Sequence, residues 1–109
     1  MNNLSKEYAI LSATMFPLCE EQEDIRHVYL NEKYFSNGFT KLIARTINNL
    51  NTKHEYCDSL AVESFASRDQ NFNHDFFIEL LAFTPITYTG IIFYMRELKK
   101  DFIARKLNV

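Results

Sequence analysis

The sequence is poor in the residues that tight turns and phosphate-binding loops require. Of its 109 residues, only two are Gly and two are Pro. Glycine supplies the positive φ angles of tight turns and lets the backbone approach a phosphate group closely, so a turn-dense β fold is disfavoured. Neither G-x-x-x-x-G-K-[ST] nor G-x-G-x-x-G occurs. We therefore expect no catalytic residues, no nucleotide cofactor and no enzyme activity in this chain.

The chain also lacks an excess of positive charge. The sum of Lys and Arg is 12 and that of Asp and Glu is 14, which gives a formal net charge of −2 at pH 7. A protein that neutralises many phosphates carries a broad basic face. We therefore expect no direct contact with nucleic acid.

Cysteines and long apolar runs are equally scarce. Cys19 and Cys57 are too few for the disulfide framework of a small secreted protein. No stretch reaches the roughly 18 apolar residues of a membrane span, and the N-terminus lacks the pattern of a secretory leader. These features predict a cytoplasmic protein with no membrane segment.

What the sequence does contain is apolar residues at helical spacing. The first such row is Leu4, Tyr8, Leu11, Met15 and Leu18, at steps of four and three. We predict an all-α fold, a compact bundle of about six helices in a single domain over residues 1–109. Its globular part spans 1–86, and a long helix follows over about 88–109. No Gly, Pro or polar cluster ends that helix before Val109, so we expect the sequence to stop inside it.

Helix starts are marked by short polar residues. The predicted N-caps are Ser5, Asp58 or Ser59, and Asn73. Asn37-Gly38 is a turn dipeptide, and Thr84-Pro85 breaks the helical pattern. The expected buried positions are Ile25, Val28 and Tyr29 in a short second helix; Phe39, Leu42, Ile43, Ile47 and Leu50 in a third; Leu60 or Ala61, Val62 and Phe65 in a fourth; and Phe76 or Phe77, Leu80 and Leu81 in a fifth.

Residues with reactive side chains form no recognisable site. His54 and Cys57 lie three positions apart, but a structural zinc site needs four such ligands, so no metal site is expected. The same pair could make a base and a nucleophile, yet no orienting or oxyanion motif accompanies it. The acidic stretch over 20–24 is interpreted as a solvated connector rather than as an acidic binding patch.

Four phenylalanines near the fifth helix could stack nucleic-acid bases or fill the core. They are Phe72, Phe76, Phe77 and Phe83. Base-stacking aromatics normally lie in a basic groove, whereas the charged neighbours here are mainly acidic. Core packing is therefore favoured.

The last helix carries a stripe at Ile91, Met95, Leu98 and Phe102. This spacing fits a seam within the chain or a seam between chains. The fifth helix is expected to cover only the first half of so long a rod, which leaves both interpretations open for the second half.

The order and separation of several short segments resemble the N-terminal domain of DnaB-type replicative DNA helicases. The segments are Glu7 to Ser12, Val28 to Phe35, Phe39 to Ile43, Ile47 to Leu50, Asp58 to Val62, Glu79 to Leu81, Pro85, Tyr94 to Lys99, and Arg105 to Leu107. They cover nearly the whole chain. The sequence departs from the residues common in that family at three places: Ser12-Ala13-Thr14, Phe16-Pro17 and Thr40-Lys41. These differences suggest a divergent member of the family.

The resemblance implies a domain that does no chemistry itself. In that family this helical module forms a collar above an ATP- and Mg-dependent motor ring, pairs with other helicase subunits through its long helix, and helps to recruit primase or a helicase loader. The residues expected to meet a neighbour are Tyr94, Leu98, Phe102 and Arg105. The isolated chain is expected to be a monomer or a weak homodimer, and replacing Leu98 or Phe102 by Asp is expected to leave its melting curve nearly unchanged.

Three other interpretations stay open. The helicase-binding C-terminal domain of bacterial primase has a similar helical arrangement, although the helix pattern that starts at Leu4 favours the helicase. A small stand-alone adaptor or antirepressor would end at Val109. A thiol hydrolase would use His54 and Cys57. A downstream reading frame that continues into G-x-x-x-x-G-K-[ST] would favour the helicase, and a stop codon would favour the adaptor.

Overall fold

A computed structural model describes residues 3–16, 22–53, 57–84 and 86–107. The regular elements over these ranges are all helical, which confirms the predicted all-α class, the six helices and the long last helix. They are α1 (Asn3–Met15), α2 (Gln22–Arg26), the short 3-10 helix η2 (Glu32–Tyr34), α3 (Gly38–Thr52), α4 (Ser59–Ala66), α5 (His74–Leu81) and α6 (Tyr88–Leu107).

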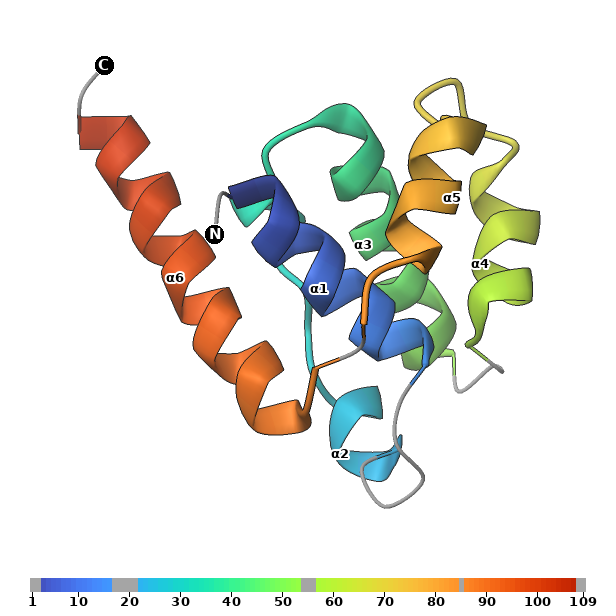
Figure 1. Cartoon of the computed structure of the whole chain (residues 1–109), viewed down its shortest axis with the longest axis horizontal. Helices are drawn as coiled ribbons and strands as arrows, with labels where there is room; N and C mark the ends of the chain where they lie inside the picture. Colours follow the sequence, from blue (N-terminus) through green and yellow to red (C-terminus); the bar gives the residue numbers. More distant parts are fainter. Residues whose placement is uncertain (1–2, 17–21, 54–56, 85, 108–109) are drawn as a thin grey trace.

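Helix α1 is the centre of the packing. It contacts α3, α5 and α6 (Figure 1). The short helix η2 packs against both α3 and α6. Helix α4 lies against α3, on the side of the molecule away from α6. Every residue from Glu7 to Met15 is buried, because α1 has neighbours on all sides. The largest fully buried side chains come from α1, α3, α5, α6 and the connections beside η2: Glu7, Ile10, Leu11, Met15, Leu30, Phe35, Ile43, Ile47, Phe77, Leu80, Ile91 and Leu98.

Several of the described helices begin at side-chain caps. The Asn37 Oδ1 atom accepts the Thr40 N–H at 2.8 Å, and the Thr40 Oγ1 atom accepts the Asn37 N–H at 3.4 Å, so the Asn-Gly pair starts α3 with a capping box. Asp58 and Asn73 cap α4 and α5, as predicted. The prediction for Ser5 is wrong, because α1 already begins at Asn3 and Ser5 lies inside it.

The connection between α1 and the start of α3 depends on a buried carboxylate. Glu7 is fully buried in the second turn of α1, and its Oε1 atom accepts the Ser36 N–H at 2.9 Å. At the preceding position of α1, the Lys6 ammonium pairs with the Asp101 carboxylate of α6 at 3.6 Å. Polar contacts therefore hold α1 to two of its neighbours.

The expected apolar faces are confirmed in part. Ile25, Val62, Phe77 and Leu80 are buried. Tyr29, Leu60 and Phe65 are exposed by 69%, 74% and 47%. Tyr29 follows the end of α2 at Arg26 and so belongs to no helical face, while α4 rests on α3 through the positions of Val62 and Ala66 instead.

The phenylalanines near α5 pack with one another and with the core, as expected. Phe72 stacks near Phe39 and Phe77 at ring-centroid distances of 6.1 and 5.5 Å. Phe76 is 43% exposed, yet its ring meets Phe39 edge-on at 5.7 Å. Phe83 meets Tyr8 in the same way at 5.4 Å. This aromatic cluster joins α5 and its flanking loops to α1 and α3.

The inner face of α6 belongs to the core along most of the helix. Ile91 and Leu98 are almost fully buried, and Phe102 is half-buried against Tyr34 of η2 at 5.4 Å between ring centroids. The expectation that the fifth helix covers the first half of this helix is wrong, because the main contacts of α6 are to α1 and η2. Helices α1 and η2 cover what the fifth helix does not reach.

We predict that Leu98→Ala lowers the free energy of unfolding by about 2–5 kcal/mol, the cost of emptying a buried leucine site. Leu107→Ala, on the same helix at a side chain that is 79% exposed, should change it by less than about 0.5 kcal/mol. Urea denaturation followed by far-ultraviolet circular dichroism measures both. Equally small losses would show that α6 does not depend on Leu98 for its packing.

Candidate interaction surfaces

The four residues of α6 that were expected to face a partner lie mainly on its inner side. Leu98 is 1% exposed and belongs to the core, so its assignment to a partner surface is wrong. Tyr94 and Phe102 are partly buried, and only Arg105 is exposed. The physical reason is that α6 lies along α1 instead of projecting from the globular part. The apolar stripe of Ile91, Met95, Leu98 and Phe102 therefore packs within the chain.

The opposite side of α6 carries a second apolar row that sequence reasoning missed. Phe93, Ile103 and Leu107 are exposed by 54%, 45% and 79%. At about 100° per residue, their separations of ten and four residues place all three on one outward face. We call these three residues the outer row of α6. The apolar run over 91–95 indicates that the start of this helix is apolar on all sides. Periodicity alone does not show which side packs against the rest of the chain and which side faces solvent.

Charged side chains accompany the outer row. Arg96, Lys99 and Lys100 are exposed, and the Lys100 ammonium pairs with the Glu97 carboxylate at 3.4 Å. Phe93 and Leu107 lie seven positions on either side of Lys100. In an antiparallel pair of such helices centred there, each Phe93 would therefore face the Leu107 of the second copy. Phe93 and Leu107 can thus match across a two-fold axis, whereas Ile103 would face Glu97 and Lys100 would face its own copy.

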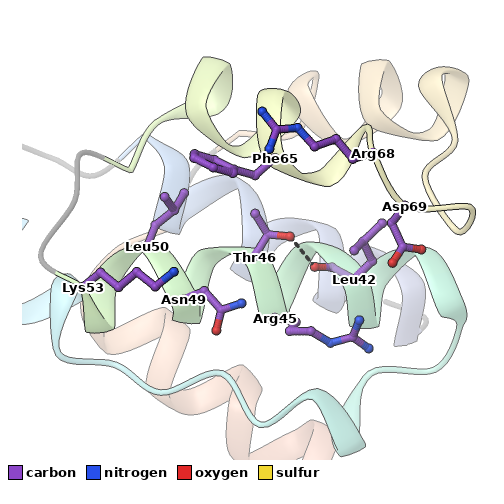
Figure 2. Close-up of a pocket in the computed structure, with 9 residues that line it drawn as sticks. All are labelled: Leu42, Arg45, Thr46, Asn49, Leu50, Lys53, Phe65, Arg68 and Asp69. Carbon is purple, nitrogen blue, oxygen red and sulfur yellow. Dashed lines mark hydrogen bonds between the residues drawn. The ribbon is translucent and has the colours of Figure 1, made fainter.

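A groove of about 350 Å³ lies between α3 and α4 (Figure 2). Leu42, Leu50 and Phe65 give it an apolar lining. Its charged side chains are Arg45, Lys53, Arg68 and Asp69, and the polar ones are Thr46 and Asn49. Figure 2 shows Phe65 and Arg68 side by side on the α4 side, across the groove from Arg45, Asn49 and Lys53 on α3. We call this feature the α3–α4 groove.

Two of the groove cations are held in place. The Arg45 guanidinium binds the Glu32 carboxylate through Nε–Oε2 and Nη2–Oε1 contacts of 3.1 and 3.2 Å. This hydrogen bonding, with the attraction of the same carboxylate, raises the pKa of Arg45. The Arg68 guanidinium lies over the Phe65 ring at 5.3 Å from its centroid, a cation–π distance. An apolar lining with a mostly basic rim suits a segment that carries apolar and acidic side chains.

Reactive groups are not gathered in the described part of the chain. No three His, Cys, Asp or Glu side chains lie together there in a way that could hold a metal ion. The Cys57 thiol is half-buried against the core, and burial, with a smaller contribution from Asp58, raises its pKa from 9.0 to about 11. His54 and residues 20–21 of the acidic stretch lie outside the described residues, so a His54–Cys57 pair has no geometry to test.

None of the described helices combines the length and the apolar content that a membrane crossing requires. No family model, no curated protein and no solved structure matches the chain. The resemblance to the helicase domain therefore depends on the residues of this sequence alone.

We predict that Cys57 reacts slowly with iodoacetamide at about pH 8. A pKa near 11 lowers the thiolate fraction about 100-fold relative to a thiol of pKa 9.0, and the higher nucleophilicity of the more basic thiolate offsets about tenfold of this. Alkylation should be about tenfold slower in the folded chain than in urea. Mass spectrometry of the peptide that contains Cys57 separates it from Cys19, and equal rates would contradict the burial of this thiol.

Proposed function

We propose that this chain is the non-catalytic N-terminal interaction domain of a DnaB-type replicative helicase. The ordered segments of the sequence that resemble that domain support the proposal, and so does an all-helical fold that ends in the long helix α6. In this proposal the ATP- and Mg-dependent motor belongs to the parent protein. The domain itself supplies surfaces for other subunits and for primase or a loader.

The observation that carries the proposal is the division of α6 into two faces. Its inner face holds the fold through Ile91 and Leu98, while Phe93, Ile103 and Leu107 of the outer row are among the exposed large apolar residues. A helix that uses one face for its own domain and presents apolar residues on the other is suited to pairing with a second copy. We therefore assign subunit pairing to the outer row, in place of the inner residues expected from the sequence.

Recruitment of primase or a loader is assigned to the α3–α4 groove. Its apolar lining and three cations favour a partner segment that is amphipathic and acidic. Helix α4, which forms one side of the groove, lies on the side of the molecule away from α6 (Figure 1), so both surfaces can be occupied at once.

We predict that the double variant Phe93→Asp/Leu107→Asp weakens self-association of this chain at least about tenfold, because burying one large apolar side chain contributes about 1.5–3 kcal/mol. Its melting temperature should stay within a few degrees of the original, since both side chains are exposed. Sedimentation velocity over about 10 μM to 1 mM measures the association, a range that covers weak dimers.

The matched control for this experiment is Leu60→Asp. Leu60 is exposed by 74%, similar to Leu107, but it lies on α4, so this variant should associate within about twofold of the original chain. A chain that stays monomeric throughout the range, or a Leu60 variant that loses association equally, would contradict pairing through the outer row.

We further predict that Phe65→Glu weakens binding of the primase encoded by the same genome at least about tenfold, because it places a carboxylate among apolar contacts. Binding is measured by calorimetry with both purified proteins. Self-association through α6 should be unaffected, so the two assignments can fail separately. Unchanged primase binding by this variant would exclude the α3–α4 groove as the recruitment surface.

A further inference from the structure

A second pocket of the molecule is lined by cations without a carboxylate. Its volume is about 400 Å³, and it lies where η2, the start of α3 and the C-terminal end of α6 meet. The charged side chains that line it are Lys33, Lys41, Arg105 and Lys106, and the remaining lining comes from Phe35, Ser36 and Phe102. We call it the basic pocket. Such a concentration of positive charge is unexpected in a chain of net charge −2.

The acidic side chains of the surrounding elements are directed elsewhere. Glu32 is the acidic residue of η2, and its carboxylate binds Arg45, which does not line the pocket. Asp101 of α6 pairs with Lys6, and α3 contains no acidic residue. Glu7 is close in the structure, since it accepts the Ser36 N–H, but it is fully buried and does not line the pocket. The four cations therefore lack a neutralising partner among the residues that line the pocket.

Two of these cations are positioned by contacts of their own. The Lys41 ammonium donates to the Phe35 carbonyl oxygen and, at 3.1 Å, to the Glu32 carbonyl oxygen. An ammonium group has three donors, so one N–H remains for a ligand. The Lys106 ammonium lies over the Phe102 ring at 5.6 Å from its centroid. Backbone carbonyls and an aromatic face orient these groups without cancelling their charge.

We propose that the basic pocket binds a compact phosphate anion with several charges, a di- or triphosphate group. Four cations from three elements converge on a volume that suits such a group, and lysine is a common phosphate ligand that acts as a point charge. A single carboxylate of an acidic peptide would neutralise only one of the four. This site goes beyond the proposed function and does not depend on it.

The test is titration of the chain with inorganic tripolyphosphate at about 0.15 M salt, followed by calorimetry, because exposed charges more than about 8 Å apart are largely screened there. Lys33→Glu and Arg105→Glu should each weaken binding at least about tenfold, because each removes one cation from the pocket and adds one repulsive charge. Both side chains are exposed, so neither change is expected to unfold the chain. Lys99→Glu is the matched control, because it makes the same charge change on α6 at a residue outside the pocket lining, and it should change binding less than about twofold.

The remaining outcomes decide the nature of the ligand. Equal affinities for tripolyphosphate and for a nucleoside triphosphate would support recognition of the phosphates alone, and a higher affinity for the nucleotide would support a site in which the nucleoside also takes part. Failure to bind tripolyphosphate would overturn the proposal. Equal losses in all three variants would also overturn it, because they indicate general attraction to a charged surface. Binding of a single-stranded oligonucleotide alone would overturn it in favour of an extended nucleic-acid site.

Discussion

The arrangement of this protein depends on the packing of α6 along the central helix α1. Helix α1 has no exposed side from Glu7 to Met15, so α6 must cover the flank that α3 and α5 leave open. Ile91 and Leu98 provide most of that cover, and the contact between Tyr34 and Phe102 extends it through η2. Once the inner face of α6 is used in this way, the residues on its outer side are fixed as surface. The location of every candidate interaction surface on α6 follows from this contact.

The sequence was sufficient for the class of fold and for most helix starts. Apolar residues at steps of three and four define the helices, and a short side chain that can accept a backbone N–H marks a helix start; Asp58 and Asn73 were identified in this way. Ser5 was not, because a capping residue is recognised only relative to where the helix begins, and α1 begins earlier. The burial of Glu7 was also unpredictable. A carboxylate can be buried only if a particular backbone donor meets it, and its donor, Ser36, lies 29 positions along the chain.

The burial of Leu98 and the partial burial of Phe102 were not predicted, for a related reason. Periodicity shows that Leu98 and Phe102 share a face, but it does not show what that face meets. The decision required knowing that α1 is central, which is a property of the whole packing and not of any single helix. The basic pocket was equally inaccessible to sequence reasoning. Lys33 and Lys41 lie far along the chain from Arg105 and Lys106, and the overall charge of −2 conceals their convergence.

The short segment from Phe35 to Asn37 is held on both sides by side chains from elsewhere. Glu7 holds the Ser36 N–H, Lys41 holds the Phe35 carbonyl oxygen, and the capping box fixes Asn37 at the start of α3. Phe35 and Ser36 line the basic pocket, so these contacts fix the backbone on this side of the pocket in the absence of a ligand. Binding of a ligand to this segment would cost little backbone conformational entropy, so even a small molecule with few contacts could be retained there.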